Sequence, residues 1–208
     1  QHRQSATVGA LNAFTSMRGA VDDEQAVGGY FVLSAKALLR NAGEQARLMH
    51  DTLHTVRFDE TTRIRELVSQ QRARRDQSVT GNGHGLAMAA ASAGMSPLAK
   101  LNHELSGMAG IRRLRRLDDS LADQTALADF TARLAALHAS IEAAPSQLLV
   151  VAEHHRVAEL ASDAAAVWAH EAPAREQEAF ALAPCRERRG EFWVANTQVN
   201  FCARAYPT

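Results

Sequence analysis

The sequence is poor in cysteine and aromatic residues, and it has no excess charge of either sign. Two cysteines, Cys185 and Cys202, are too few for a disulfide framework or a cysteine metal cage. Basic and acidic residues number 23 each, so the formal net charge is zero. A dedicated nucleic-acid or membrane-surface protein normally carries a basic excess, and the balance argues against both. No apolar run approaches the ~20 residues of a membrane-spanning helix.

The amino terminus also lacks two familiar features. It does not begin with Met, and residues 1–7 are too polar for a signal peptide. We therefore expect the natural beginning of the protein to lie upstream of Gln1. We also expect a cytoplasmic protein.

Alanine is abundant, and with Leu, Arg and Glu it favours helix throughout the chain. Two strands come first: a mixed segment at residues 8–18 and the apolar run Tyr30–Leu33, joined by a turn-rich loop. This spacing predicts an antiparallel pair. Helices are then predicted by three- and four-residue apolar spacing. The predicted helices cover residues 38–57, 59–79, 86–93, 97–105, 111–117, 121–141 and 157–168.

Four local signals refine these predictions. Asp59 is the expected N-cap of the second helix, and Ser96 is the expected cap of the helix that begins at Pro97. The apolar run at residues 147–153 predicts a buried strand, and residues 192–206 are β-rich and predict a last strand. The predicted fold class is α+β, an antiparallel sheet packed by a block of helices.

The nine histidines require a test for metal motifs. His50 and His54 lie four residues apart and share one helix face, which can suit zinc. A hydrolytic site also needs a third ligand and a carboxylate base, and Leu53 stands where an inverted zincin motif has Glu. No HExxH motif occurs. We therefore interpret both residues as ordinary helix histidines.

The other candidate motifs are also incomplete. His154 and His155 follow an apolar run but have no Ser or Cys placed as a nucleophile. The glycine-rich segment at 81–85 lacks the Lys-Ser/Thr of a phosphate loop and favours a hinge. The basic runs at 72–75 and 111–116 have acidic neighbours and no nearby aromatic residues in sequence, so nucleic-acid binding is not expected.

Three passages in series carry a family resemblance. The first contains SAKAL at 34–38 and RFDE at 57–60, and the second is the Gly-His pair Gly83-His84 leading into an alanine-rich helix. The third is the TQVN segment at 197–200 that runs on to Ala-Tyr-Pro. Together they resemble the presequence-protease branch, subfamily C, of the insulinase or pitrilysin (M16) zinc metallopeptidases.

The resemblance implies a role in a larger enzyme. Such enzymes have four related α+β domains around a chamber, with zinc and its HxxEH motif in the first. Residues 1–170 are similar to the third domain, 171–190 to a linker, and 191–208 to the first strand of the fourth domain. The resemblance thus implies a piece of the non-catalytic chamber wall, inactive alone. The implied partners are the missing amino-terminal catalytic half and, for the parent enzyme, unfolded peptides.

No site residue follows from the resemblance. The family's zinc and catalytic motifs match no position here, so we expect no catalytic, cofactor-binding or metal residue, and zinc only in the parent enzyme. Gly83-His84 matches the family pattern without a known role. The alternatives are a non-catalytic interaction module of M16 fold and a small metalloenzyme using His50 and His54. An incomplete last sheet would leave residues 191–208 in dimer contacts or disorder.

Overall fold

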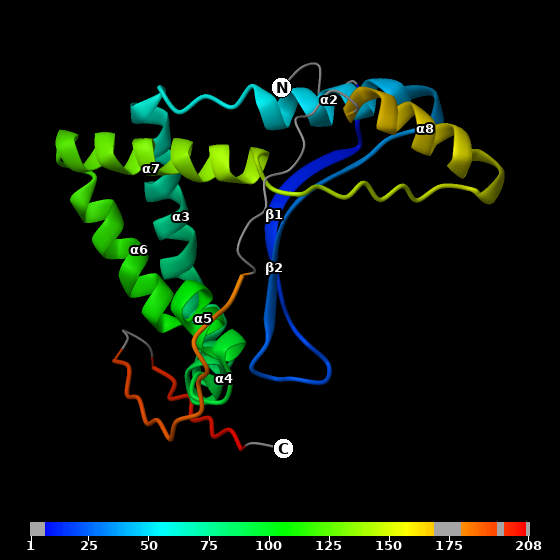
Figure 1. Cartoon of the computed structure of the whole chain (residues 1–208). Helices are drawn as coiled ribbons and strands as arrows, with labels where there is room; N and C mark the ends of the chain where they lie inside the picture. Colours follow the sequence, from blue (N-terminus) through cyan, green and yellow to red (C-terminus); the bar gives the residue numbers. More distant parts are fainter. Residues whose placement is uncertain (1–6, 169–179, 195–197, 207–208) are drawn as a thin grey trace. The chain divides into compact units, whose positions relative to one another are not determined.

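A computed structural model describes residues 7–168, 180–194 and 198–206, and Figure 1 shows its elements. The described part of the chain is mostly helical and contains a single two-stranded sheet, which confirms the α+β prediction. The strands are β1 (Ala10–Gly19) and β2 (Val27–Lys36). The helices are α2 (Ala42–His54), α3 (Thr61–Gly81), α4 (Gly83–Ser92), α5 (Pro97–Ser106), α6 (Met108–Ser120), α7 (Gln124–Glu142) and α8 (Val157–Trp168), with short 3₁₀ turns η1 (Leu39–Asn41) and η2 (His154–Arg156).

Strands β1 and β2 form the antiparallel hairpin that the sequence predicts. Its ends are fixed by backbone hydrogen bonds from Gly9 to Lys36 (2.8 Å) and from Ala20 to Ala26 (2.9 Å). The pairing of the beginning of one strand with the end of the other is what makes the pair antiparallel.

The chain divides into two compact units whose boundaries cut through β1, β2 and α7. The first unit comprises residues 1–16, 30–57 and 134–178. Within it α2 packs against α8, and α2 buries Ala46 and Leu48. The amide of Gln45 on α2 donates a 2.9 Å hydrogen bond to the carbonyl of Ala35, so the strand and the helix that follows it are joined locally.

The second unit comprises residues 17–29, 58–133 and 179–208. Helix α6 packs against both α3 and α5, and α5 packs against α4. Ser96 caps α5 as predicted, because its hydroxyl accepts a 3.2 Å hydrogen bond from the backbone N–H of Ala99. The buried apolar residues of the helices and their connections form the core of this unit. They are Leu86, Ala93, Ile111, Leu121 and Leu127.

Three local predictions were wrong. Glu60, not Asp59, precedes α3, because the carbonyl of Glu60 accepts the first helical hydrogen bond from Ile64 at 3.0 Å. Residues 147–153 form no strand, and neither do the described parts of 192–206, which are 192–194 and 198–206. Apolar composition favours a strand only where a neighbouring strand supplies hydrogen bonds. The sheet of the described residues contains β1 and β2 alone.

The expected division at residues 170 and 190 remains a prediction, and residues 169–179 of the linker lie outside the described part of the chain. Residues 180–190 carry no regular secondary structure. Within the ranges that the structure describes, no helix has the length and apolar character needed to cross a membrane.

Candidate functional site

The basic run at 111–116 lies on helix α6, and the helix separates its apolar and charged residues. Ile111 is buried, with 2% of its surface exposed, whereas Arg112, Arg113 and Arg116 are exposed. Residues 112 and 116 are four apart and therefore share one face of the helix. The helix thus anchors itself through Ile111 and presents guanidinium groups to solvent.

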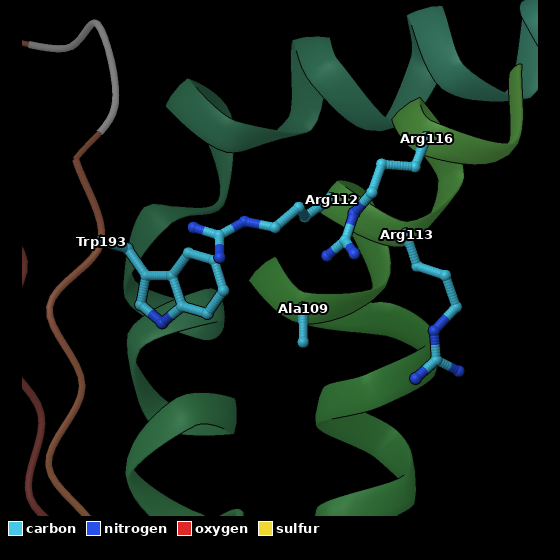
Figure 2. Close-up of a pocket in the computed structure, with 5 residues that line it drawn as sticks. All are labelled: Ala109, Arg112, Arg113, Arg116 and Trp193. Carbon is cyan, nitrogen blue, oxygen red and sulfur yellow. The ribbon is translucent and has the colours of Figure 1, made fainter. Parts of the chain in front are cut away.

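These arginines line a pocket of about 260 Å³ together with Ala109 and Trp193. Figure 2 shows the Arg112 side chain extending from α6 to the indole of Trp193, while Arg113 and Arg116 extend from the same helix. The guanidinium carbon of Arg112 lies 4.4 Å from the centre of the indole ring, within the range of a cation–π interaction. Trp193 therefore forms an aromatic wall beside a basic helix face.

Glu191 holds the indole in this position. The indole N–H of Trp193 donates a 2.6 Å hydrogen bond to one oxygen of Glu191, and Arg189 contacts the other oxygen at 2.5 Å. Nε2 of His103, which is fully buried on α5, lies 3.2 Å from the first oxygen without hydrogen-bond geometry. The His103 ring meets the Trp193 ring edge-on at 6.0 Å. Residues 189–193 are thereby attached to α5 as well as α6.

Among the residues that the structure describes, the pocket is lined by three positively charged arginines and by no acidic side chain. Arg113 lies 3.5 Å from the carboxylate of Glu104. In the described ranges no carboxylate pairs with Arg112 or Arg116. A guanidinium group presents planar, parallel N–H donors that match a carboxylate or phosphate group. The arrangement is chemically suited to holding an anion, and it contains no nucleophile with a general base.

The histidines considered for metal binding lie in the other unit. The rings of His50 and His54 are 4.3 Å apart on α2, and Trp168 lies 5.2 Å from His50. Nδ1 of His54 is 3.0 Å from a carboxylate oxygen of Glu142. No set of three or more potential ligand side chains in the described part of the chain is arranged to hold a metal ion.

The other candidates from the sequence, His155 and the pair Gly83-His84, lie on η2 and α4. His155 on η2 is exposed and lies 3.6 Å from Glu153, which is exposed as well. Gly83 begins α4 and is buried, and a Cβ atom there would overlap the ring of Phe201. His84 is exposed on the same helix. The glycine of the Gly-His pair is thus required by close packing, which is a structural role rather than a chemical one.

Sequence reasoning did not identify the pocket, although it noted the basic run on α6. It set nucleic-acid binding aside because no aromatic residue was near in sequence, and the aromatic wall comes from Trp193, far along the chain. Spacing within one helix could identify the arginines. Nothing in the local pattern around residue 193 indicates that it lies against α6.

Comparison with known proteins agrees with the resemblance seen in the sequence. The chain is similar to the zebrafish (Danio rerio) protein "Presequence protease, mitochondrial", 29% identical over 96 residues, 46% of this chain and 9% of the relative. It is also similar to "Presequence protease 1, chloroplastic/mitochondrial" of Arabidopsis thaliana, 28% identical over 87 residues, 42% of this chain and 8% of the relative.

These matches cover less than a tenth of each relative's length. A family profile matches more of the chain. The profile, described as associated with peptidase M16 of subfamily C, extends over residues 1–117. This range includes the hairpin, helices α2 to α5 and the part of α6 that carries the basic run at 111–116. This chain belongs to that family, the segment associated with the subfamily C peptidases of M16.

Proposed function

We propose that the chain forms part of the non-catalytic wall of the peptide-degrading chamber of a zinc-dependent oligopeptidase, and that it is inactive alone. The observation that carries this proposal is the family match over residues 1–117, in a chain that corresponds to a small part of two presequence proteases. In this role the chain holds an extended peptide against a catalytic half that closes over it. The substrates of the parent enzyme would be unfolded peptides.

The chemistry of the chain fits a supporting role. The 208 residues contain neither HExxH nor HxxEH, the motifs that supply two zinc ligands and a catalytic carboxylate. Zinc would then be held by the parent enzyme's other half, which is also the proposed partner. The names of the two relatives refer to mitochondria and chloroplasts, and the cytoplasmic location expected for this chain remains a prediction.

The test is a cleavage assay combined with zinc analysis. The purified chain is incubated with an unstructured fluorogenic peptide, alone and after addition of the zinc-bearing half of a presequence protease. We expect neither zinc nor cleavage with the chain alone, and cleavage when the two parts are combined. Stoichiometric zinc and cleavage by the chain alone would overturn the proposal.

A matched control separates assembly from chemistry. The same mixture is prepared with the Glu of the HxxEH motif in the added half replaced by Gln, which should permit assembly but abolish cleavage. If the unaltered parts form a complex that never cleaves peptide, the alternative of a non-catalytic interaction module replaces the proposed function.

A further inference from the structure

We propose that the pocket between α6 and Trp193 binds a carboxylate group of a peptide, through the guanidinium groups of Arg112 and Arg116 with the indole as an aromatic wall. The ligand is either an Asp or Glu side chain or a peptide's terminal carboxylate. The peptide identity rests on the proposed function, whereas the anion-binding property rests on the pocket itself.

The first argument is charge complementarity. Arg112 and Arg116 have exposed side chains on one helix face, and in the described ranges neither pairs with an acid. Other arginines of the same helix do contact carboxylates, as Arg115 contacts Asp76 at 2.8 Å and Arg113 lies 3.5 Å from Glu104. Two neighbouring guanidinium groups offer a carboxylate several charge-assisted hydrogen bonds.

The second argument is preorganisation. Trp193 does not need to be ordered when a ligand arrives, because Glu191 already accepts its indole N–H at 2.6 Å and is itself held by Arg189. Glu191 is largely buried, with 14% of its side chain exposed, and its two oxygens face Arg189 and the indole rather than Arg112. A wall fixed in advance lowers the entropic cost of binding. Glu191 is thus a positioning residue.

The third argument concerns the class of ligand. Nucleic-acid binding normally uses a basic surface with several aromatic side chains for stacking, whereas this pocket has one indole in a chain of zero net charge. A volume of about 260 Å³ is below the range of pockets for drug-sized ligands and suits a single side chain or chain terminus. A peptide carboxylate is therefore favoured over a polyphosphate or an oligonucleotide.

The test measures binding without cleavage, so its failure is distinguishable from failure of the chamber-wall proposal. The chain has two tryptophans, so Trp168→Phe leaves Trp193 as the only indole reporter. The full chain carrying this change is titrated with three otherwise identical peptides free of aromatic residues. One has an internal Glu and an amidated end, one has Gln in its place with an amidated end, and one has Gln with a free terminal carboxylate.

We expect a change of Trp193 fluorescence with at least one carboxylate peptide and at least about tenfold weaker binding of the Gln amide. The two carboxylate peptides distinguish a side chain from a terminus. Arg112→Gln and Arg116→Gln should each weaken binding by about tenfold, with calorimetry as a second readout. Arg133→Gln, an exposed arginine of α7, is the matched control and should bind as the parent does.

Two results would overturn the inference. The first is equal binding of the Glu and Gln amides together with no preference for the free terminus. The second is tighter binding of inorganic phosphate or a short single-stranded oligonucleotide than of either carboxylate peptide, which would assign the pocket to phosphate groups. Unchanged circular dichroism of each variant ensures that a lost affinity reports the pocket rather than the fold.

Discussion

At the scale of single residues, helical spacing identified candidates for burial, but only the structure separates the buried from the exposed. Leu127 and Leu137 belong to the same predicted apolar pattern on α7. Leu127 is 3% exposed and Leu137 is 59% exposed. Leu121, which directly follows α6, is 1% exposed and is among the largest fully buried side chains of the described residues. The stability of the second unit therefore depends on residues such as Leu121.

We expect Leu121→Ala to lower the free energy of unfolding by about 2–5 kcal/mol, because it removes buried methyl groups and leaves a cavity. Leu137→Ala makes the same chemical change at an exposed position and should cost less than about 1 kcal/mol. Urea unfolding followed by circular dichroism measures both. Equal destabilisation by the two variants would contradict the burial assigned to Leu121.

At the scale of elements, α3 and α6 pack together although α3 has no buried residue. Polar contacts connect them. Asp118 on α6 accepts a 2.6 Å hydrogen bond from the hydroxyl of Ser69 and a 2.9 Å bond from Arg72. These bonds, from Ser69 first and then Arg72, hold the pKa of Asp118 below its ordinary value of 3.8. The hydrogen bonds that Arg72 donates to Asp118 and to Asp119 raise the pKa of Arg72.

Asp118→Asn should lower the free energy of unfolding by about 1 kcal/mol at neutral pH, since it weakens the charge-assisted bonds between the two helices. A lowered folded-state pKa means that the unfolded chain binds the proton more tightly. The stabilisation that Asp118 contributes to the folded state is therefore complete above the pKa of this residue in the unfolded chain. It is lost as the pH falls through the lower pKa of the folded state. The difference between parent and variant should shrink below about pH 4.

Thermal unfolding at a series of pH values checks this prediction. Asp129→Asn, an exposed aspartate on α7, is the control and should change stability little at any of these pH values. A difference between parent and Asp118→Asn that grew with acidification would show that the sign assigned to the carboxylate is wrong.

At the scale of the whole molecule, several large apolar residues remain in solvent within the described residues. Phe192 is 100% exposed and Val194 is 99% exposed, on either side of Trp193. The sequence predicts that residues 191–208 make dimer contacts or are disordered. Exposed apolar side chains close together favour the first outcome, since association would remove them from water.

We expect the chain to self-associate through this segment, and the double variant Phe192→Ser with Val194→Ser to weaken association by about tenfold or more. Sedimentation velocity over a range of concentrations measures the effect. Val21→Ser, a change at another fully exposed valine, is the control and should leave association unchanged. A parent chain that stays monomeric at all concentrations would contradict the prediction.

The sequence predicted the local structure well where the causes are local. The hairpin, the Ser96 cap and the existence of each helix follow from propensity, periodicity and hydrogen bonding between near neighbours. The strands predicted at 147–153 and, as far as residues 192–194 and 198–206 are described, at 192–206 were wrong because a strand depends on a partner from elsewhere in the chain. Composition cannot show whether that partner is present.

By itself the sequence determined the fold class, the helical segments, the missing zinc motifs and the family, since each depends on residue identity or short-range spacing. Only the tertiary structure decided that Trp193 lies over Arg112, that Glu191 fixes its ring, and that Leu121 is buried while Leu137 is exposed. Such contacts join residues from separate elements. The packing of the whole chain selects them, and no local pattern contains that information.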